Sequence, residues 1–134
     1  MGTTDTALKT YYENYNAALQ FLVAKQNGRK MEDYLKALGY NSVAVYGMND
    51  LGNCVVRELK DSKTVRLLYA LDQGSPKLYF DIDCYKLDEV PPNKKPDIVI
   101  VTLPYLYDEI HKDIERTLGR PTISITQLVY DMDV

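Results

Sequence analysis

The sequence is poor in the residues on which several common kinds of site depend. It has no Trp, one His and two Cys, and no hydrophobic run approaches the roughly 20 residues of a membrane span. The cysteines, Cys54 and Cys84, lack the spacing of metal ligands, and we expect two buried, reduced thiols rather than a disulfide. The polar first residues do not have the pattern of a signal peptide. These absences predict a cytoplasmic chain with no membrane partner.

The charge of the chain argues against one further class of partner. The formal net charge is −3, and the Lys and Arg residues are scattered, with the densest pair, Lys94 and Lys95, in a proline-flanked loop. Nucleic-acid surfaces need clustered basic residues, so we expect no nucleic-acid partner. With 134 residues, 46% hydrophobic and 26% charged, the chain has the size and composition of a soluble globular protein with a core of its own.

Two helices are predicted at the N-terminus, over residues 5–27 and from residue 31 to Gly39. The first has apolar residues at the three-and-four spacing of one helical face, namely Leu8, Tyr11, Tyr12, Tyr15, Ala18, Leu19, Leu22 and Val23. The second places Met31, Tyr34, Leu35 and Leu38 inward. We interpret residues 1–39 as a helical hairpin extension. Its tyrosine-rich face has two readings: packing onto the rest of the chain, which we favour, or a homodimer surface.

Residues 40–134 alternate between short apolar runs and helical patterns. Strands are predicted over 42–46, 65–71, 77–82, 97–102 and 121–125, with helices over 51–59 and 105–118 and a helical turn over 86–90. This alternation is typical of right-handed crossovers between parallel strands. The predicted fold class is therefore α/β: a Rossmann-like three-layer sandwich whose five-stranded parallel sheet has the order 3-2-1-4-5, with helices on both faces.

The segment 43–52 (VAVYGMNDLG) has the strand–glycine turn–helix context of a dinucleotide-binding loop. Gly47 allows a tight turn, and Gly52 allows the helix to pack closely. The N–H groups that open the helix suit a pyrophosphate. Asp72, at the end of the next strand, is placed to accept hydrogen bonds from ribose hydroxyls.

One position departs from this motif. The middle glycine, which lets the backbone approach a phosphate, is replaced by Asn49, and Asp50 adds a negative charge beside the anion site. Two interpretations therefore stay open. The turn either binds a nucleotide, or it is kept for folding after ligand binding was lost.

Three segments carry a resemblance to a known family: 43–52, 97–105 (DIVIVTLPY) and 122–128 (TISITQL). Over about residues 40 to 130 the chain resembles a bacterial family of NAD(P)-binding Rossmann-like domains. These domains accompany cell-surface polysaccharide enzymes, glycosyltransferases and sugar-modifying methyltransferases. The resemblance implies NAD(P) or a nucleotide-sugar as ligand. The candidate binding residues are Gly47, Met48, Asn49, Asp50, Leu51, Gly52 and Asp72, with Thr102 and Pro104 on the facing loop.

No catalytic residues are apparent. Dehydrogenases of the short-chain or epimerase type need a Tyr with a Lys four residues later, and none of the twelve tyrosines has one. A receiver domain would need a Lys after the last strand, where 124–127 has none. We therefore expect a non-catalytic nucleotide- or dinucleotide-binding module, accessory to sugar-transfer enzymes, with a second copy or a larger enzyme domain as partner. The alternatives are a structural or dimerisation domain with a vestigial loop and, third, an oxidoreductase subunit completed by a partner.

Two acidic groupings have a functional and a plain reading. On the predicted helix 105–118, Asp108 and Glu115 share a face with His111, which could form a metal site, although a solvated helix face is the interpretation we favour. Asp81 and Asp83 would point to the same side of the predicted strand 77–82. Paired carboxylates can act in acid–base chemistry, but solvation of an edge strand is the commoner reason for them.

Overall fold

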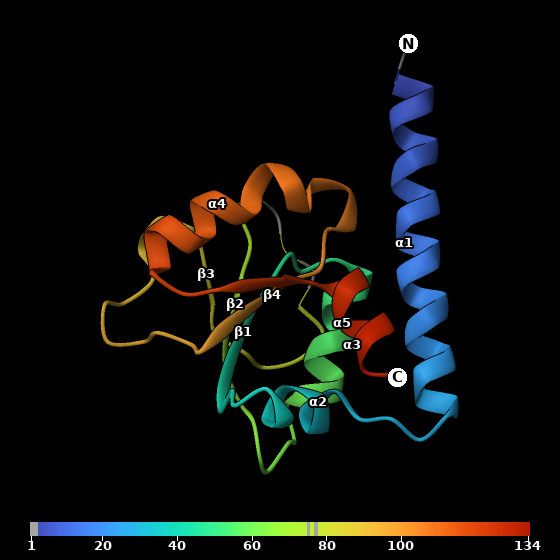
Figure 1. The fold of residues 1–134 in the computed structure, drawn as a ribbon. Coiled ribbons are helices and arrows are strands. Elements are labelled where there is room, and N and C mark those ends of the chain that lie inside the picture. The colour runs from blue at the N-terminus through green and yellow to red at the C-terminus, as the bar shows by residue number, and fades with distance from the viewer. Residues whose placement is uncertain (1–2, 75, 77) are drawn as a thin grey trace.

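The computed structural model describes residues 3–74, 76 and 78–134, and it confirms the predicted fold class (Figure 1). All strand pairs are parallel, and the sheet order is β3-β2-β1-β4-β5. The strands are β1 (Ser42–Tyr46), β2 (Arg66–Leu71), β3 (Cys84–Tyr85), β4 (Ile98–Val101) and β5 (Thr122–Ser124). The order reverses between β1 and β4, so the carboxyl ends of these strands form the edge where ligands of such folds bind.

Helices cover both faces of this sheet. The α-helices are α1 (Thr3–Gln26), α2 (Met31–Ala37), α3 (Asp50–Leu59), α4 (Tyr107–Leu118) and α5 (Ile125–Asp131), and the 3-10 turns are η1 (Leu87–Glu89) and η2 (Pro104–Leu106). Residues of α1, α2, α3 and α5 form one buried cluster with the sheet, and residues of α4 form a second cluster with the opposite face. Of the helices in the described part of the chain, none is both long and apolar enough to cross a membrane.

The central strands are buried because each side chain meets a helix layer. In β1, Val43 and Val45 belong to the cluster on the α3 side, whereas Ala44 and Tyr46 belong to the cluster on the α4 side. All four residues of β4 are buried. Continuous apolar runs of this kind are what a parallel sheet covered on both faces requires.

Helix α1 lies along the outside of the molecule and packs against α5 and η2 (Figure 1). Its buried residues are the small Ala17 and Ala24. The Nε2 group of Gln20 donates to a carboxylate oxygen of Asp133 over 3.2 Å, and the Nδ2 group of Asn27 donates to the other oxygen over 2.9 Å. The body of the chain therefore holds α1 by a side made of small and polar residues together with the half-buried Phe21.

The prediction that the tyrosine-rich face packs onto the rest of the chain is wrong for α1. Six of its large residues are exposed: Leu8 62%, Tyr11 73%, Tyr12 67%, Tyr15 57%, Leu19 45% and Leu22 54%. We call these six residues the α1 face. The half-buried Tyr34 and Tyr40 do pack against the core. The division into an extension over 1–39 and a domain over 40–134 stays a prediction, although Ala17 and Met31 share one cluster with β1.

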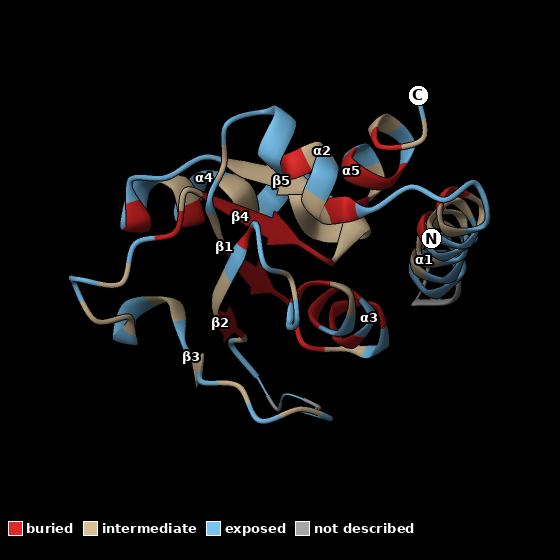
Figure 2. Ribbon diagram, turned by 90° about the horizontal axis from the view of Figure 1, so that it is seen from below, coloured by how far each residue is buried: buried red, intermediate tan, exposed pale blue. Residues whose placement is uncertain are grey.

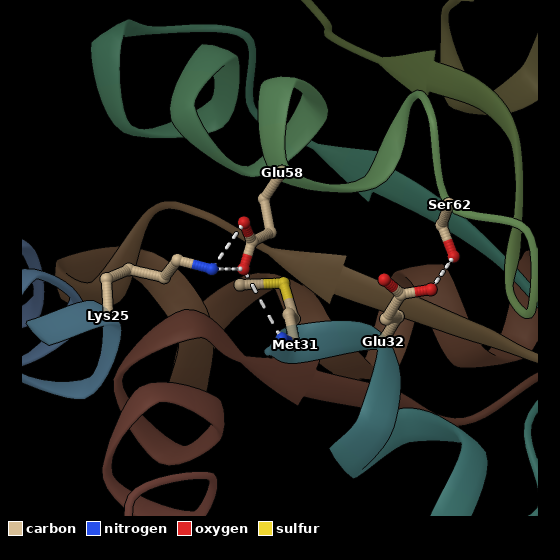
Figure 3. A network of polar contacts seen from close by, with 5 residues as sticks. All are labelled: Lys25, Met31, Glu32, Glu58 and Ser62. Carbon is tan, nitrogen blue, oxygen red and sulfur yellow. Dashed lines mark hydrogen bonds and ion pairs between the residues drawn. The ribbon is translucent and has the colours of Figure 1, made fainter. Parts of the chain in front are cut away.

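A network of polar contacts fixes α1 and α2 relative to α3 (Figure 3). The Nζ group of Lys25 lies 2.7 and 2.9 Å from the two carboxylate oxygens of Glu58, and the backbone N–H of Met31 points to the same carboxylate over 3.4 Å. The hydroxyl of Ser62 donates to Glu32 over 2.6 Å. Glu58 thus joins the end of α1 to the start of α2.

The predicted third strand differs from the structure. The third strand was expected over 77–82; residue 77 lies outside the described residues, and 78–82 form no strand. The pairing is made by Cys84 and Tyr85 instead, opposite Ala70 and Leu71 of β2. The apolar Phe80 packs against the core and lies under Arg57 and Lys60 of the α3 region, so packing rather than a ladder explains its apolar character.

The final helix, α5, is missing from the sequence-based expectation, which extended the last strand to Ile125. Ser124 ends the strand and begins the helix, because its side chain accepts a hydrogen bond from the N–H of Thr126 over 3.3 Å. Ile125, Leu128 and Val129 of α5 are then buried in the core cluster shared with α1 and α3.

Candidate functional site

The turn after β1 is built around two glycines that have no room for a side chain. Gly47 has φ +100°, and a Cβ there would lie 2.8 Å from Cγ of Leu103 and 2.9 Å from Oγ1 of Thr102. A Cβ at Gly52 would lie 2.0 Å from the carbonyl oxygen of Gly47. Because both positions tolerate only hydrogen, the first turn of α3 rests directly on the backbone of the glycine turn.

The Asn49 side chain caps α3. Its Oδ1 atom accepts a hydrogen bond from the N–H of Gly52 over 2.9 Å, and the Asn49 backbone is extended, as an N-cap requires. The backbone carbonyl of Asn49 accepts from the Nδ2 group of Asn53 over 2.9 Å. The residue that replaces the middle glycine of the motif therefore occupies one of the helix donors itself.

Asp72 directly follows β2, and its carboxylate reaches the turn that follows β1. Its Oδ2 atom accepts the N–H of Met48 over 2.8 Å, and its Oδ1 atom accepts the N–H of Gly74 over 2.8 Å. Both carboxylate oxygens are thus engaged with backbone donors of this chain. Asp72 was predicted to bind ribose hydroxyls; in the structure it holds the turn and the segment that follows β2.

Thr102 is completely buried and holds the turn from β4. Its hydroxyl lies 2.9 Å from the carbonyl oxygen of Tyr46 and also contacts the carbonyl oxygen of Gly47. Pro104 begins η2 and lines a different hollow, shared with Glu13 and Asn16 of α1. The predicted facing loop therefore contributes a buried support at one residue and a contact with α1 at the other.

Negative charge dominates this edge of the sheet. Burial raises the pKa of Tyr46, and the charge of Asp72 raises it further. The pKa of the Cys84 thiol is raised by the same two causes in the same order. Asp50 is exposed in the first turn of α3. Two carboxylates thus lie where a phosphate would approach, and both would repel it.

The structure brings most of the predicted site together. Gly47, Asn49, Gly52 and Thr102 are joined by direct contacts, and Asp72 is joined to them through the backbone N–H of Met48. The side chains of Met48 and Leu51 are buried in the core. Sequence analysis missed Asn53, which is buried, contacts Asn49 and accepts the N–H of Tyr79 over 3.2 Å. The sequence signal for this role was the spacing, because a residue four positions after an N-cap lies one helical turn from it and can contact it.

A second polar group lies on α4. It includes His111 and Glu115 of the predicted metal site but not Asp108. The His111 ring nitrogen Nδ1 lies 3.0 Å from Glu115, whose carboxylate also accepts the Thr122 hydroxyl over 2.6 Å. The His111 ring stacks on Tyr107 at 4.8 Å. Among the described residues, no group of three or more His, Cys, Asp and Glu side chains could hold a metal ion.

The remaining candidates are separate from the turn. Because 78–82 form no strand, Asp81 and Asp83 do not share a strand face as predicted; Asp83 lies 3.8 Å from Nζ of Lys94, and Asp81 borders a hollow with Lys60. Both cysteines are free, but Cys54 is exposed and Cys84 is only half-buried, which corrects the expectation of two buried thiols.

Cys54 borders a groove between α1 and α3. This groove has a volume of about 360 Å³, and its surface is mostly apolar; we call it the α1–α3 groove. It is lined by Ala18, Phe21, Leu22, Lys25, Leu51, Cys54, Arg57 and Glu58. Since Leu22 belongs to both, the groove is continuous with the α1 face.

The chain matches no protein-family model, no curated protein and no solved structure.

Proposed function

We propose that this chain is a non-catalytic interaction domain on a Rossmann-like scaffold, which presents helix α1 to another protein. The exposure of the α1 face carries this proposal. Exposed apolar patches larger than a few hundred Å² on a soluble protein mark interaction sites, whereas scattered apolar residues do not. The α1 face is continuous, because its residues recur on one side of one helix, and three of its six members are tyrosines. Tyr is enriched at the energetic centres of interfaces.

The closed state of the glycine turn supports a structural role for the loop. A phosphate at such a turn is held by backbone N–H groups at the start of the helix. Here the N–H of Gly52 is donated to Asn49, and the N–H of Met48 is donated to Asp72. An incoming phosphate would have to displace an amide and a carboxylate that already satisfy these donors.

Calorimetric titration of the whole chain with NAD, NADP and a UDP-sugar tests the proposal. We expect no saturable heat with any of the three. The matched variant is Asn49→Gly, which restores the middle glycine and frees the N–H of Gly52 at a cost of a few tenths of a kcal/mol in helix capping. Saturable binding by the unmodified chain, weakened when Asp72 is replaced by Ala, would overturn the assignment of a closed turn.

A nucleotide- or dinucleotide-binding module is the second candidate function. Two observations favour it: Gly47 and Gly52 have no room for a Cβ, and the turn lies between β1 and β4, where the strand order reverses. In this case the resemblance to domains that accompany polysaccharide enzymes would extend to the ligand. The same titration decides between the two candidates.

The cytoplasm is the compartment that we propose for either function. Both cysteines are free thiols, and disulfides are rare in reducing compartments.

A further inference from the structure

We propose that the partner of the α1 face is a second copy of this chain, related by a twofold axis, with the two α1 helices antiparallel. This inference rests on the proposed function, because it names the occupant of the same surface. Three independent features of the described residues support a copy of this chain over another protein: the spacing of the apolar residues, the shape of the surface, and its charges.

The apolar residues of α1 have the spacing of a helix-pairing seam. Leu8, Tyr15 and Leu22 recur every seven residues, and Tyr11 and Ala18 fall between them. Tyr12 and Leu19 widen the same stripe. A repeat of 3.5 residues is the pattern by which one helix packs along another helix over several turns. The occupant that this face fits is therefore a helix of similar length with large apolar residues.

The shape of the surface is complementary to itself. The first turns of α1 project beyond the rest of the fold (Figure 1), and Leu8, Tyr11 and Tyr12 in the N-terminal half of α1 are exposed. The C-terminal half of α1 is flanked by the apolar α1–α3 groove. Figure 2 views α1 nearly end-on, at the edge of the molecule. An antiparallel twofold pair places the projecting half of each copy against the groove of the other, as a closed dimer requires.

Centring this pair on Tyr15 matches residues by size and by charge. Leu8 of one copy then lies opposite Leu22 of the other. The negatively charged Asp5 of one copy lies opposite Lys25 of the other. Lys25 lies on the rim of the groove with Arg57 and Glu58, and these three side chains together carry one net positive charge. A parallel pair would instead place each Asp5 beside its copy and each Lys25 beside its copy. Charge and the opposed helix dipoles both favour the antiparallel arrangement.

The available area fits a specific dimer. With about 200 Å² of surface on each large side chain, the exposed fractions of the α1 face correspond to on the order of 700 Å² on each copy. A specific interface of standard size buries about 800 Å² on each partner. The groove adds apolar surface to this sum, so α1 and the groove suffice without further contacts.

Sedimentation velocity of the full chain over a range of micromolar concentrations tests for the second copy. We expect a monomer–dimer equilibrium that is weakened about 100-fold or more in the double variant Tyr11→Glu/Tyr15→Glu, since it buries four charges at the centre of the pair. The matched control is Tyr79→Glu, because Tyr79 is 66% exposed and lies outside the α1 face. The control should associate like the unmodified chain.

Cysteine cross-linking in a Cys54→Ser background tests the orientation. Tyr15→Cys should form a covalent dimer on mild oxidation, because residue 15 lies at the twofold axis. Leu8→Cys should not cross-link to itself. Residue 8 of one copy lies opposite residue 22 of the other, so the two copies of residue 8 are about 21 Å apart along the helices. An equimolar mixture of Leu8→Cys and Leu22→Cys chains should cross-link.

The outcomes separate this inference from the proposed function. A chain that stays monomeric at every concentration overturns the second copy, and the proposed interaction domain would then need a foreign partner. A dimer that persists in Tyr11→Glu/Tyr15→Glu places the interface elsewhere and also overturns the inference. Cross-linking of Leu8→Cys to itself overturns the antiparallel arrangement. Nucleotide binding, by contrast, bears only on the proposed function.

Discussion

Two regions of this protein have strong apolar patterns in sequence, but one is buried and the other is exposed. Strand β4 is apolar throughout and β1 is apolar from Val43 onward, and Val45 and Ile100 have no exposed surface. The α1 face is equally regular in sequence, yet its side chains are 45–73% exposed. An apolar pattern therefore shows that a surface needs to be covered, but it does not show what covers it. For β1 and β4 the cover is in the same chain; for α1 we infer that it is a second copy.

The largest expected effect tests this contrast directly. Ile100→Ala should lower the free energy of unfolding by about 3 kcal/mol, because it leaves a cavity between two packed layers. Leu8→Ala should change it by less than about 0.5 kcal/mol in the monomer, because the side chain is 62% exposed. Urea unfolding at a concentration that keeps the chain monomeric measures both. Equal losses would mean that the α1 face is covered within a single chain.

Gly52→Ala should come next and sharpens the contrast at the glycine turn. The new Cβ would lie 2.0 Å from the carbonyl oxygen of Gly47, so α3 must shift, and we expect a loss of about 2 kcal/mol despite the better helix propensity of Ala. The control is Gly28→Ala at the end of α1, where φ is +77° but a Cβ meets nothing within 4 Å. Its cost should be only about 1 kcal/mol, from the backbone alone. Thermal or urea unfolding compares the two.

The contrast extends to polar groups, and Tyr69 of β2 is the buried case. Its hydroxyl donates to the carbonyl oxygen of Lys94 over 2.9 Å, and burial raises the pKa of Tyr69 from 10.0 to about 12. The folded state thus holds this proton more tightly than the unfolded state. The stabilisation is complete below pH 10 and is lost as the pH rises from 10 to 12. Tyr69→Phe should cost about 1 kcal/mol at neutral pH.

Ultraviolet absorbance of the tyrosinate form checks this prediction. One tyrosine of the folded chain should ionise near pH 12, and that step should be missing in Tyr69→Phe. If the step persisted in the variant, another tyrosine would be the buried group. The exposed Tyr12 of the α1 face serves as the control, since Tyr12→Phe should leave the step in place.

Glu115 of α4 is the half-buried counterpart and should give the smallest effect. Hydrogen bonds from Thr122 first and from His111 second lower the pKa of Glu115 from its usual 4.5. The unfolded state therefore binds this proton more readily, so the stabilisation is present above pH 4.5 and is lost as the pH falls below it. Because the side chain is 38% exposed, solvent screens the group, and Glu115→Gln should cost about 0.5 kcal/mol or less. Acid unfolding curves of the two proteins should nearly coincide.

Much of the fold follows from local patterns in the sequence. The run 42–46 is apolar and β-branched and ends at a glycine, and β1 has the predicted bounds. The helix 105–118 was bounded by Gly119, which does adopt the left-handed conformation at its end. The strand–turn–helix around Gly47 also formed as predicted, because each step of this unit depends on neighbouring residues.

The errors lie where burial depends on residues far away in the sequence. Phe80 and Ile82 looked like strand residues because they are apolar, but they pack against the core without pairing. Ile125 was included in a strand because the capping role of Ser124 appears only when the helix that follows is buried between α1 and the sheet. The α1 face was assigned to packing because the pattern alone cannot distinguish an inner from an outer surface.

By itself, the sequence determined the order of the strands in the sheet, their parallel direction and the position of the glycine turn, since these depend on local backbone preferences and on the periodicity of apolar residues. Only the tertiary structure decided that Asp72 accepts the N–H of Met48 in that turn, and that the side of α1 with Ala17 and Ala24 faces inward. Both depend on distances between segments remote in the chain, which hydrogen-bond geometry and close packing fix only once the whole chain is folded.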